Sequence, residues 1–293
     1  MSDRLEIQDS TVRELLKEQF PAWSDLPISP VKKSGWDNRT FHLGQDKLVR
    51  LPSAQRYAAQ VEKEQRWLPK LAPELTVEIP QPLAIGRPSA IYPWHWSIYK
   101  WIDGENAEII QPGKAMDHFA IDIANFLKEL QGIDATDGPL AGKHNFYRGA
   151  SLLVYDEETK GSIIALEDEI DSAKALGLWE NCISSIYEGK SVWVHGDFSA
   201  SNILVRNGSL AAVIDFGSLG VGDPACDLVI AWTFLDKNAE KIFSNKMNMD
   251  EDTWLRARGW ALWKALISLV ALEERASSCG QVQREIIGRV IAA

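Results

Sequence analysis

The sequence is poor in the features that mark secreted, membrane-spanning and zinc-binding proteins. It has three cysteines, Cys182, Cys226 and Cys279, and no C-x-x-C pair, so neither a disulfide framework nor a zinc or redox dithiol site is expected. No run reaches the roughly 18 consecutive apolar residues of a membrane-spanning helix. The polar, acidic start MSDRLEIQDS does not resemble a secretory leader. We therefore expect a cytoplasmic protein with reduced thiols and no membrane partner.

An excess of basic charge is also missing. The net charge is -10, and residues 107–216 hold 17 acidic against 8 basic residues, which accounts for nearly all of it. Nucleic acid is a poor partner for such a surface because phosphate binding needs clustered Lys and Arg. Metal or organic cations suit it better, although acidic runs such as 156–158 and 167–169 are most often solvated surface.

Several enzyme signatures are absent. There is no H-E-x-x-H and no paired Cys/His ligand set for zinc, and no G-x-S-x-G elbow of a serine hydrolase. Gly189-Lys190-Ser191 resembles the end of a P-loop, but residue 184 is Ser where that motif requires Gly. Metalloproteases, α/β-hydrolases and P-loop NTPases are therefore poor candidates.

The patterning that is present predicts two parts of different character in the 293 residues. Residues 27–51 carry short apolar runs around the turn signal Gly44-Gln45-Asp46, which predicts a β-hairpin. A helical period over residues 55–68 is limited by Pro69, and residues 89–102 are β-like again. We place a boundary after residue 102.

From residue 103 onward the pattern predicts mainly helices. An apolar stripe at helical spacing predicts a half-buried helix; it is formed by Phe119, Ile123, Phe126, Leu127 and Leu130. Trp254, Trp260 and Trp263 lie on a broadly apolar stretch that predicts a buried helix.

One stretch of this second part, VHGDFSASNILV at residues 194–205, is dense in polar groups. It follows a predicted strand at 191–194 and leads into ILVRNGSLAAVI, whose Asn-Gly pair is the strongest short hairpin signal. The hairpin would gather Asp197, Asn202 and Asp215 at one end of a small sheet. Carboxylate and amide oxygens there suit Mg²⁺ together with a phosphate.

These residues carry a resemblance. His195-Gly196-Asp197 with Asn202, followed by Asp215-Phe216-Gly217 and the run GDPACD at 222–227, resembles the aminoglycoside phosphotransferase family of the protein-kinase-like superfamily. The interval between 217 and 222 is too short for an activation segment, and no A-P-E follows. The resemblance implies an α+β, bilobal protein-kinase-like fold with a β-rich nucleotide-binding lobe at 1–102 and a mainly helical catalytic and substrate-binding lobe at 103–293.

The resemblance also implies roles at the matching positions. Asp197 would accept or orient the proton of the attacking hydroxyl, while Asn202 and Asp215 would hold Mg²⁺ on the phosphates. His195 would shape the loop by hydrogen bonding. Asp223 and Asp227 would brace it.

In the N-terminal lobe, Arg50 stands where such kinases place a phosphate-binding Lys, and Glu64 on the next helix would pair with it. Lys47 is the alternative, but strand alternation puts it on the opposite face from Arg50. The phosphate loop at 34–38 contains one glycine, so Ser34 and Asn38 would cap the phosphates.

The segment 97–102, with Tyr99 and Trp101, would be the interlobe hinge that binds the nucleotide base. The rings of Trp94, Trp96 and Trp101 near it could contact base or substrate.

The expected function is Mg²⁺-dependent transfer of the γ-phosphate of ATP or GTP to a hydroxyl of a small molecule. An aminoglycoside-type antibiotic, a polyhydroxylated cation, is the first acceptor to consider, which would make the enzyme one of antibiotic resistance. The alternatives are a kinase of a macrolide or of another small hydroxylated metabolite, and a nucleotide-binding module without catalysis. The sequence leaves open the acceptor, the hydroxyl modified, ATP versus GTP, and the oligomeric state.

Overall fold

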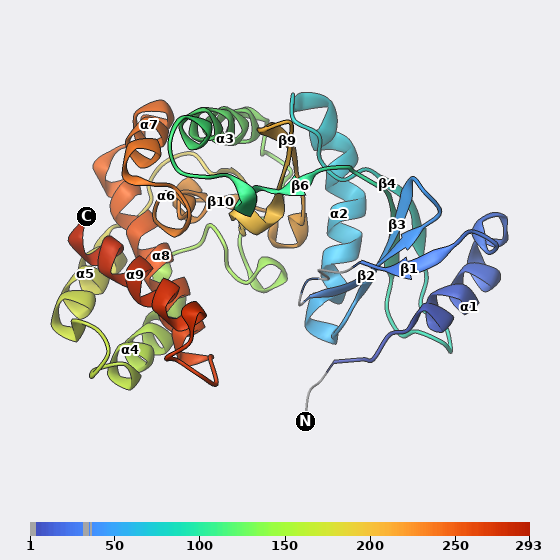
Figure 1. Cartoon of the computed structure of the whole chain (residues 1–293), viewed down its shortest axis with the longest axis horizontal. Helices are drawn as coiled ribbons and strands as arrows, with labels where there is room; N and C mark the ends of the chain where they lie inside the picture. Colours follow the sequence, from blue (N-terminus) through green and yellow to red (C-terminus); the bar gives the residue numbers. More distant parts are fainter. Residues whose placement is uncertain (1–3, 32–34, 36) are drawn as a thin grey trace. The chain divides into compact units, whose positions relative to one another are not determined.

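The computed structural model describes residues 4–31, 35 and 37–293, and its chain divides into two compact units (Figure 1). The first unit comprises Met1–Gly104 with Ala211–Gly217, and the second comprises Glu105–Leu210 with Ser218–Ala293. The division of nucleotide binding and catalysis between residues 1–102 and 103–293 stays a prediction.

An antiparallel five-stranded sheet in the order β1-β2-β3-β5-β4 forms the centre of the first unit. The predicted hairpin is confirmed, with β2 and β3 joined by a turn in which Gly44 takes a φ of 65°. Such a left-handed conformation favours glycine. The strands of the sheet are β1 (Ile28–Pro30), β2 (Asn38–Leu43), β3 (Lys47–Pro52), β4 (Pro82–Gly86) and β5 (Trp96–Lys100).

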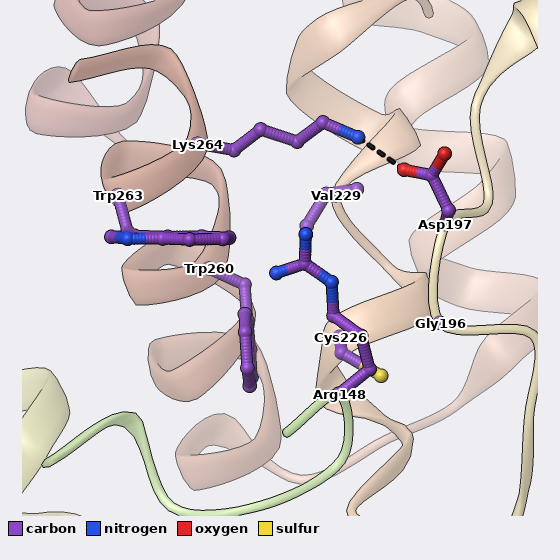
Figure 2. Close-up of a pocket in the computed structure, with 8 residues that line it drawn as sticks. All are labelled: Arg148, Gly196, Asp197, Cys226, Val229, Trp260, Trp263 and Lys264. Carbon is purple, nitrogen blue, oxygen red and sulfur yellow. Dashed lines mark hydrogen bonds and ion pairs between the residues drawn. The ribbon is translucent and has the colours of Figure 1, made fainter. Parts of the chain in front are cut away.

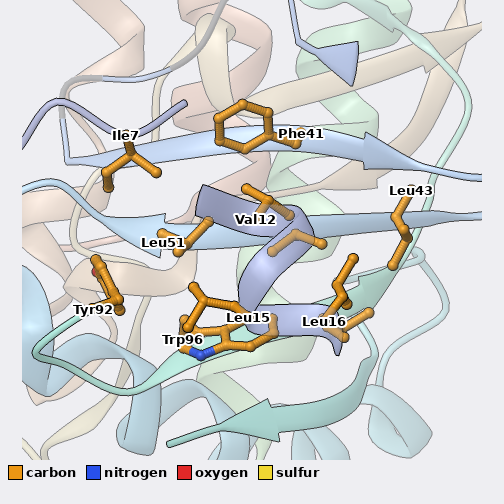
Figure 3. Close-up of a cluster of buried hydrophobic side chains, with 11 residues drawn as sticks. Ile7, Val12, Leu15, Leu16, Phe41, Leu43, Leu51, Tyr92 and Trp96 are labelled. Atoms are coloured by element: carbon orange, nitrogen blue, oxygen red, sulfur yellow. The ribbon is translucent and has the colours of Figure 1, made fainter. Parts of the chain in front are cut away.

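One face of this sheet is closed by the helix α1 (Asp9–Gln19). Val12, Leu15 and Leu16 of α1 are fully buried against the sheet (Figure 3). Because side chains alternate along a strand, the strands present apolar residues on this face and leave the intervening positions to the other. The strand residues of this core are Phe41, Leu43, Val49, Leu51, Trp96 and Ile98.

The other face of the sheet carries polar groups and packs against α2 (Ala58–Leu71). Pro69 lies inside α2 and does not end it, so the predicted limit was wrong. A proline removes one backbone donor and crowds the preceding turn, but Pro69 is in the last turn, where few intrahelical bonds depend on it.

The second unit is mainly helical, as predicted. The helix α8 packs against α4, α5 and α9. Trp260 and Trp263 on it are buried as expected, whereas Trp254 is only partly buried. The predicted apolar stripe is confirmed on α3, where all five residues are buried. The helices are α3 (Lys114–Gly132), α4 (Asp156–Ala165), α5 (Ser172–Ser184), α6 (Ile230–Thr233), α7 (Lys237–Met247), α8 (Glu251–Val270) and α9 (Ser278–Ala292).

Short strands frame the polar loop of the second unit. β7 (Val192–Val194) pairs antiparallel with β10 (Gly220–Gly222), and β6 (Glu105–Asn106) pairs with β8 (Ile203–Arg206). The Asn-Gly turn joins β8 to β9 (Ser209–Val213) as predicted, with φ of 53° at Asn207 and 79° at Gly208. Across the described ranges, no helix combines the length and apolarity needed to cross a membrane.

Candidate active site

The polar loop begins at the end of β7 and is shaped by a glycine. Gly196 has a φ of 82°, and a Cβ built on it would lie 2.3 Å from the carbonyl oxygen of Ser218. Any side chain at this position would meet both backbone strain and a clash. The loop therefore turns sharply at Gly196, directly before Asp197.

The Asp227 carboxylate holds this turn in place by binding its backbone N–H groups. Its Oδ2 accepts a hydrogen bond from the His195 backbone N–H at 2.6 Å, and its Oδ1 accepts one from Gly196 N–H at 2.7 Å. The side chains of both His195 and Asp227 are fully buried. Burial raises the pKa of Asp227, while the neighbouring His195 side chain and the two N–H donors oppose that shift.

Asp197 is the most closely bonded group of the loop. Its Oδ1 accepts from Lys264 Nζ in an ion pair, its Oδ2 accepts from Asn202 Nδ2 at 3.0 Å, and its backbone N–H donates to His195 Nδ1 at 3.2 Å. Desolvation alone would raise the pKa of Asp197, but Lys264 lowers it to about 2. The carboxylate is therefore ionised at neutral pH and fixed in orientation.

Lys264 is a site residue that the sequence interpretation missed. It lies on α8, 67 positions from Asp197, and no motif includes it. The one signal was a lone cation beside Trp260 and Trp263 in an otherwise apolar stretch.

Asp223 lies farther along and anchors the segment after Gly217. Its Oδ1 caps the 3₁₀ turn Pro224–Asp227 by accepting from Ala225 N–H at 3.0 Å. Its Oδ2 accepts from Arg256 Nε at 2.6 Å, and both side chains of this pair are buried. Asp223 thus ties this segment to α8.

A pocket in the second unit opens beside Asp197 (Figure 2). Two cations, two indole rings and one thiol are among its lining groups. The lining residues are Arg148, Gly196, Asp197, Cys226, Val229, Trp260, Trp263 and Lys264. No acidic side chain other than Asp197 lines it.

The first unit holds the other predicted residues, centred on Arg50 of β3. Arg50 Nη1 donates to Glu64 Oε1 at 2.9 Å, and Nη2 forms an ion pair with Asp215. With its amide oriented toward Arg50, Asn38 accepts from Nη2 at 3.0 Å and from Nε at 3.1 Å. Burial disfavours the charge, but Asp215 and Glu64 outweigh burial and raise the pKa of Arg50.

Lys47, the alternative to Arg50, lies on the other face of β3 as expected. Its ammonium pairs with the neighbouring exposed Asp46 at 2.7 Å. Of the two predicted phosphate caps, Asn38 is buried and turned to Arg50, and Ser34 lies outside the described residues. Their role in capping phosphates stays a prediction.

The predicted hinge was wrong in extent, because residues 97–100 of it belong to β5, a strand inside the sheet. Tyr99 is buried there, and its hydroxyl donates to Glu64 Oε2 at 2.5 Å. Trp101 lies just beyond β5; its ring packs on His42 at 4.1 Å, and its Nε1 donates to Asp103 at 2.7 Å. Residues 101 and 102 remain available as a connection, and the base-binding role stays a prediction.

Two polar residues near Asp215 were not anticipated. Lys63 on α2 is buried, and its Nζ donates to the carbonyl oxygen of Gly217 at 2.8 Å. Burial lowers the pKa of Lys63 to about 7. Burial and the neighbouring Asp215 raise the pKa of Asp37. The Asp-Phe-Gly segment is therefore held by α2 of its own unit.

The predicted magnesium ligands are suitable in kind. Asp215, in the first unit, takes a left-handed φ of 63° and keeps a carboxylate about one-third exposed. Asn202, in the second unit, donates through its Nδ2 to the backbone oxygen and the side chain of Asp197. Its Oδ1 is thereby left as a hard oxygen ligand for a metal. Among the described residues, no three His, Cys, Asp or Glu side chains gather for a metal, at this site or at any other. Mg²⁺ would therefore depend on phosphate and water oxygens, as is usual for this ion.

A family model decides which group of proteins these features belong to. The model described as "Phosphotransferase enzyme family" matches residues 28–278, which include every predicted site residue. The chain belongs to the phosphotransferase enzyme family. It is therefore a small-molecule phosphotransferase.

Solved structures similar to this phosphotransferase share its fold. The GDP and kanamycin complex of APH(2")-IIIa has a TM-score of 0.70 at 21% identity, over 96% of both chains. A macrolide 2'-phosphotransferase type I has a TM-score of 0.63 at 18% identity, over 100% of this chain and 98% of that one. The macrolide 2'-phosphotransferase MphH from Brachybacterium faecium has 0.58 at 18%, over 95% and 97%. The predicted α+β, protein-kinase-like fold, with an antiparallel sheet part and a helical part, is confirmed.

Proposed function

We propose that this chain transfers the γ-phosphate of ATP or GTP to a hydroxyl of a small molecule in a Mg²⁺-dependent reaction. The observation that carries the proposal is the carboxylate of Asp197, held between Asn202 and Lys264 at the edge of a pocket. An ionised, oriented carboxylate with access to a pocket is what positioning of an acceptor hydroxyl requires.

Asp197 acts mainly by alignment. With a pKa of about 2 it is a weak base, so it accepts the hydrogen bond of the acceptor hydroxyl and directs the oxygen lone pair at the phosphorus. The proton passes to Asp197 only as the new O–P bond forms and the bond to the nucleotide breaks. Phosphoryl transfer needs such positioning and charge stabilisation more than a strong base.

The remaining residues bind or position. Arg50, fixed by Glu64, supplies a permanent cation for the nucleotide phosphates, and Asp215 and Asn202 supply oxygen ligands for Mg²⁺. The metal, when bound, neutralises phosphate charge and orients the transferred group. His195, Asp223 and Asp227 keep the loop and the following segment in shape. The GDP bound by a similar structure supports a nucleotide co-substrate.

Two classes of acceptor are proposed. An aminoglycoside is the first candidate, and the kanamycin bound by a similar structure supports it. A macrolide is the second, supported by similarity to two macrolide phosphotransferases. Arg148 and Lys264 in the pocket argue against placing an ammonium group of the acceptor directly beside them, since like charges repel.

The test is nucleotide consumption with ATP and with GTP, with and without Mg²⁺, across aminoglycosides, macrolides, choline and sugars. We expect acceptor-stimulated, Mg²⁺-dependent turnover that is lost in Asp197→Asn. Nucleotide binding that stabilises the protein equally without metal, with no turnover of any acceptor, would instead support a non-catalytic binding module.

A further inference from the structure

The Arg148 side chain of the second unit makes no ion pair among the described residues, although its charge acts on the nearby Asp197 carboxylate. Arg256, Arg258 and Arg289 there donate to carboxylate or backbone oxygens. Arg148 donates to no acceptor among the described residues, and its Nε is buried without a hydrogen bond. A buried donor left unpaired costs stability, so a ligand that supplies the acceptor would offset that cost.

Aromatic rings hold the Arg148 side chain in place. Its guanidinium carbon lies 4.4 Å from the ring centre of Trp263 and 5.4 Å from that of Trp260. Trp263 is itself fixed by a stack on Tyr155 at 4.1 Å and by a hydrogen bond from its Nε1 to Glu158 at 2.7 Å. An aromatic ring that stacks on a guanidinium contacts its flat face. The N–H groups, which lie in the guanidinium plane, can then donate hydrogen bonds to a planar or tetrahedral oxyanion.

The position of this cation places the missing acceptor beside Asp197. Figure 2 shows the guanidinium between the two indole rings on one side and Asp197 on the other. The charge of Asp197 is already matched by Lys264, and burial raises the pKa of the Cys226 thiol, which keeps it neutral. The pocket therefore has two cations, Arg148 and Lys264, for one carboxylate, and Arg148 is the one that makes no ion pair with it among the described residues.

We propose that Arg148 is the oxyanion-binding residue of this pocket. The oxyanion is either a carboxylate, phosphate or sulfate carried by the acceptor, or the phosphoryl group in transfer. Both sources rest on the proposed function, whereas binding of a free oxyanion does not. In either case the in-plane N–H groups of Arg148 donate to two oxygens of the bound group, with no change in covalent bonding.

Inorganic phosphate is the probe for the first experiment, a thermal-unfolding titration of the whole protein. Wild type should be stabilised as phosphate increases, and Arg148→Gln should bind at least about tenfold more weakly, as expected for loss of a charge-assisted hydrogen bond. Arg148→Lys should keep part of the response. Arg206→Gln, which removes an equal charge from the exposed end of β8, should match wild type.

This titration decides the proposal without an identified acceptor. No response in wild type, or equal responses in wild type and Arg148→Gln, would overturn it. Near-ultraviolet circular dichroism keeps the test valid, because it reports whether Trp260 and Trp263 retain their packing. If Arg148→Gln disturbs that spectrum, the Arg148→Lys variant is compared with wild type in salt-matched buffer. An Arg148→Lys variant that has the native spectrum and binds phosphate as tightly as wild type would contradict donation by Arg148 to two oxygens.

A second experiment distinguishes the two sources with a neutral hexose, its uronic acid and its amino sugar as acceptors. If the acceptor carries the oxyanion, the uronic acid has the highest kcat/KM. Arg148→Gln then raises the KM for the uronic acid about tenfold or more and changes the KM for the neutral hexose much less. If the oxyanion is the transferred group, Arg148→Gln lowers kcat for every acceptor and for background nucleotide hydrolysis alike. Unchanged rates throughout would count against both.

Failure of the proposed function would look different. Phosphate would still bind in an Arg148-dependent way, but neither wild type nor any variant would consume nucleotide.

Discussion

Lys264 donates to the Asp197 carboxylate from α8, a helix distant in sequence from the loop that carries Asp197. The other carboxylate oxygen accepts from Asn202 at 3.0 Å. The pair makes Asp197 a fixed, ionised acceptor of hydrogen bonds.

Replacing Lys264 should change the pH dependence of catalysis. The pKa of Asp197 is depressed to about 2, below the ordinary value of 3.8, so its protonation costs no activity in wild type above about pH 4. Lys264→Met removes the largest of the interactions that lower this pKa, while desolvation continues to raise it. The acid limb of kcat/KM should therefore move to higher pH, with Lys241→Met on the exposed side of α7 as control. Identical acid limbs in Lys264→Met and wild type would refute the assigned role.

The ion pair between Asp197 and Lys264 also stabilises the folded protein, because it lowers the pKa of Asp197 in the folded state. The contribution is complete above the unfolded value near 3.8 and is lost as the pH falls toward about 2. Lys264→Met should narrow the difference in free energy of unfolding between pH 5 and pH 2.5, as measured by urea denaturation.

Gly196→Ala should destabilise the protein more than Gly208→Ala. Both glycines have left-handed φ angles, but a Cβ at Gly196 would clash with Ser218, whereas one at Gly208 would meet no atom within 4 Å. Gly208→Ala should cost about 1–2 kcal/mol from backbone strain alone, and Gly196→Ala more than about 3 kcal/mol. Equal losses in urea denaturation would show that the contact with Ser218 has no effect.

Arg256→Met should be strongly destabilising because it leaves Asp223 buried without its partner. Loss of one member of a buried ion pair costs about 3–5 kcal/mol. Burial already raises the pKa of Asp223, so a lone carboxylate there would be harder still to ionise. Asp223→Asn should recover part of the loss in the double variant, and a double-mutant cycle without coupling would contradict the pairing.

Arg50→Met should lower the free energy of unfolding by about 3 kcal/mol or more, because Glu64 beneath it is buried. Arg50→Lys should recover a part, since one ammonium cannot bond Asn38, Glu64 and Asp215 in the same way as a guanidinium. Lys47→Met is the matched control on the opposite face and should change stability by less than about 1 kcal/mol, because the Asp46 carboxylate it pairs with is exposed and stays hydrated without it. A large effect at Lys47 with none at Arg50 would reverse the assignment.

The parts of the fold that were predictable are those governed by local chemistry. Asn207-Gly208 fixes its turn because both residues accept positive φ, and the α3 stripe reflects the helical period. The residues from His195 to Asp215 indicated the family by their spacing, and the family model confirms it.

The parts that were not predictable depend on distant contacts or on competing local signals. No local signal shows that Lys264 lies beside Asp197, because α8 also carries Arg256 and Arg258 and any of these cations is compatible with many partners. Arg148 lies in a turn outside any motif. Tyr99 was assigned to a hinge because strand ends have no sharp sequence mark, and its pairing with Leu48 of β3 shows that it lies inside the sheet. Pro69 ended the predicted helix on propensity, but it lies in the last turn of α2, where few intrahelical bonds depend on it.

The most direct test of the central claim is the transfer of labelled γ-phosphate from ATP or GTP to an acceptor hydroxyl, followed in wild type and Asp197→Asn at equal nucleotide occupancy. The account predicts labelled phosphate ester in wild type and a loss of about 100-fold or more in Asp197→Asn, with nucleotide affinity retained. Equal rates of ester formation in the two proteins would contradict it.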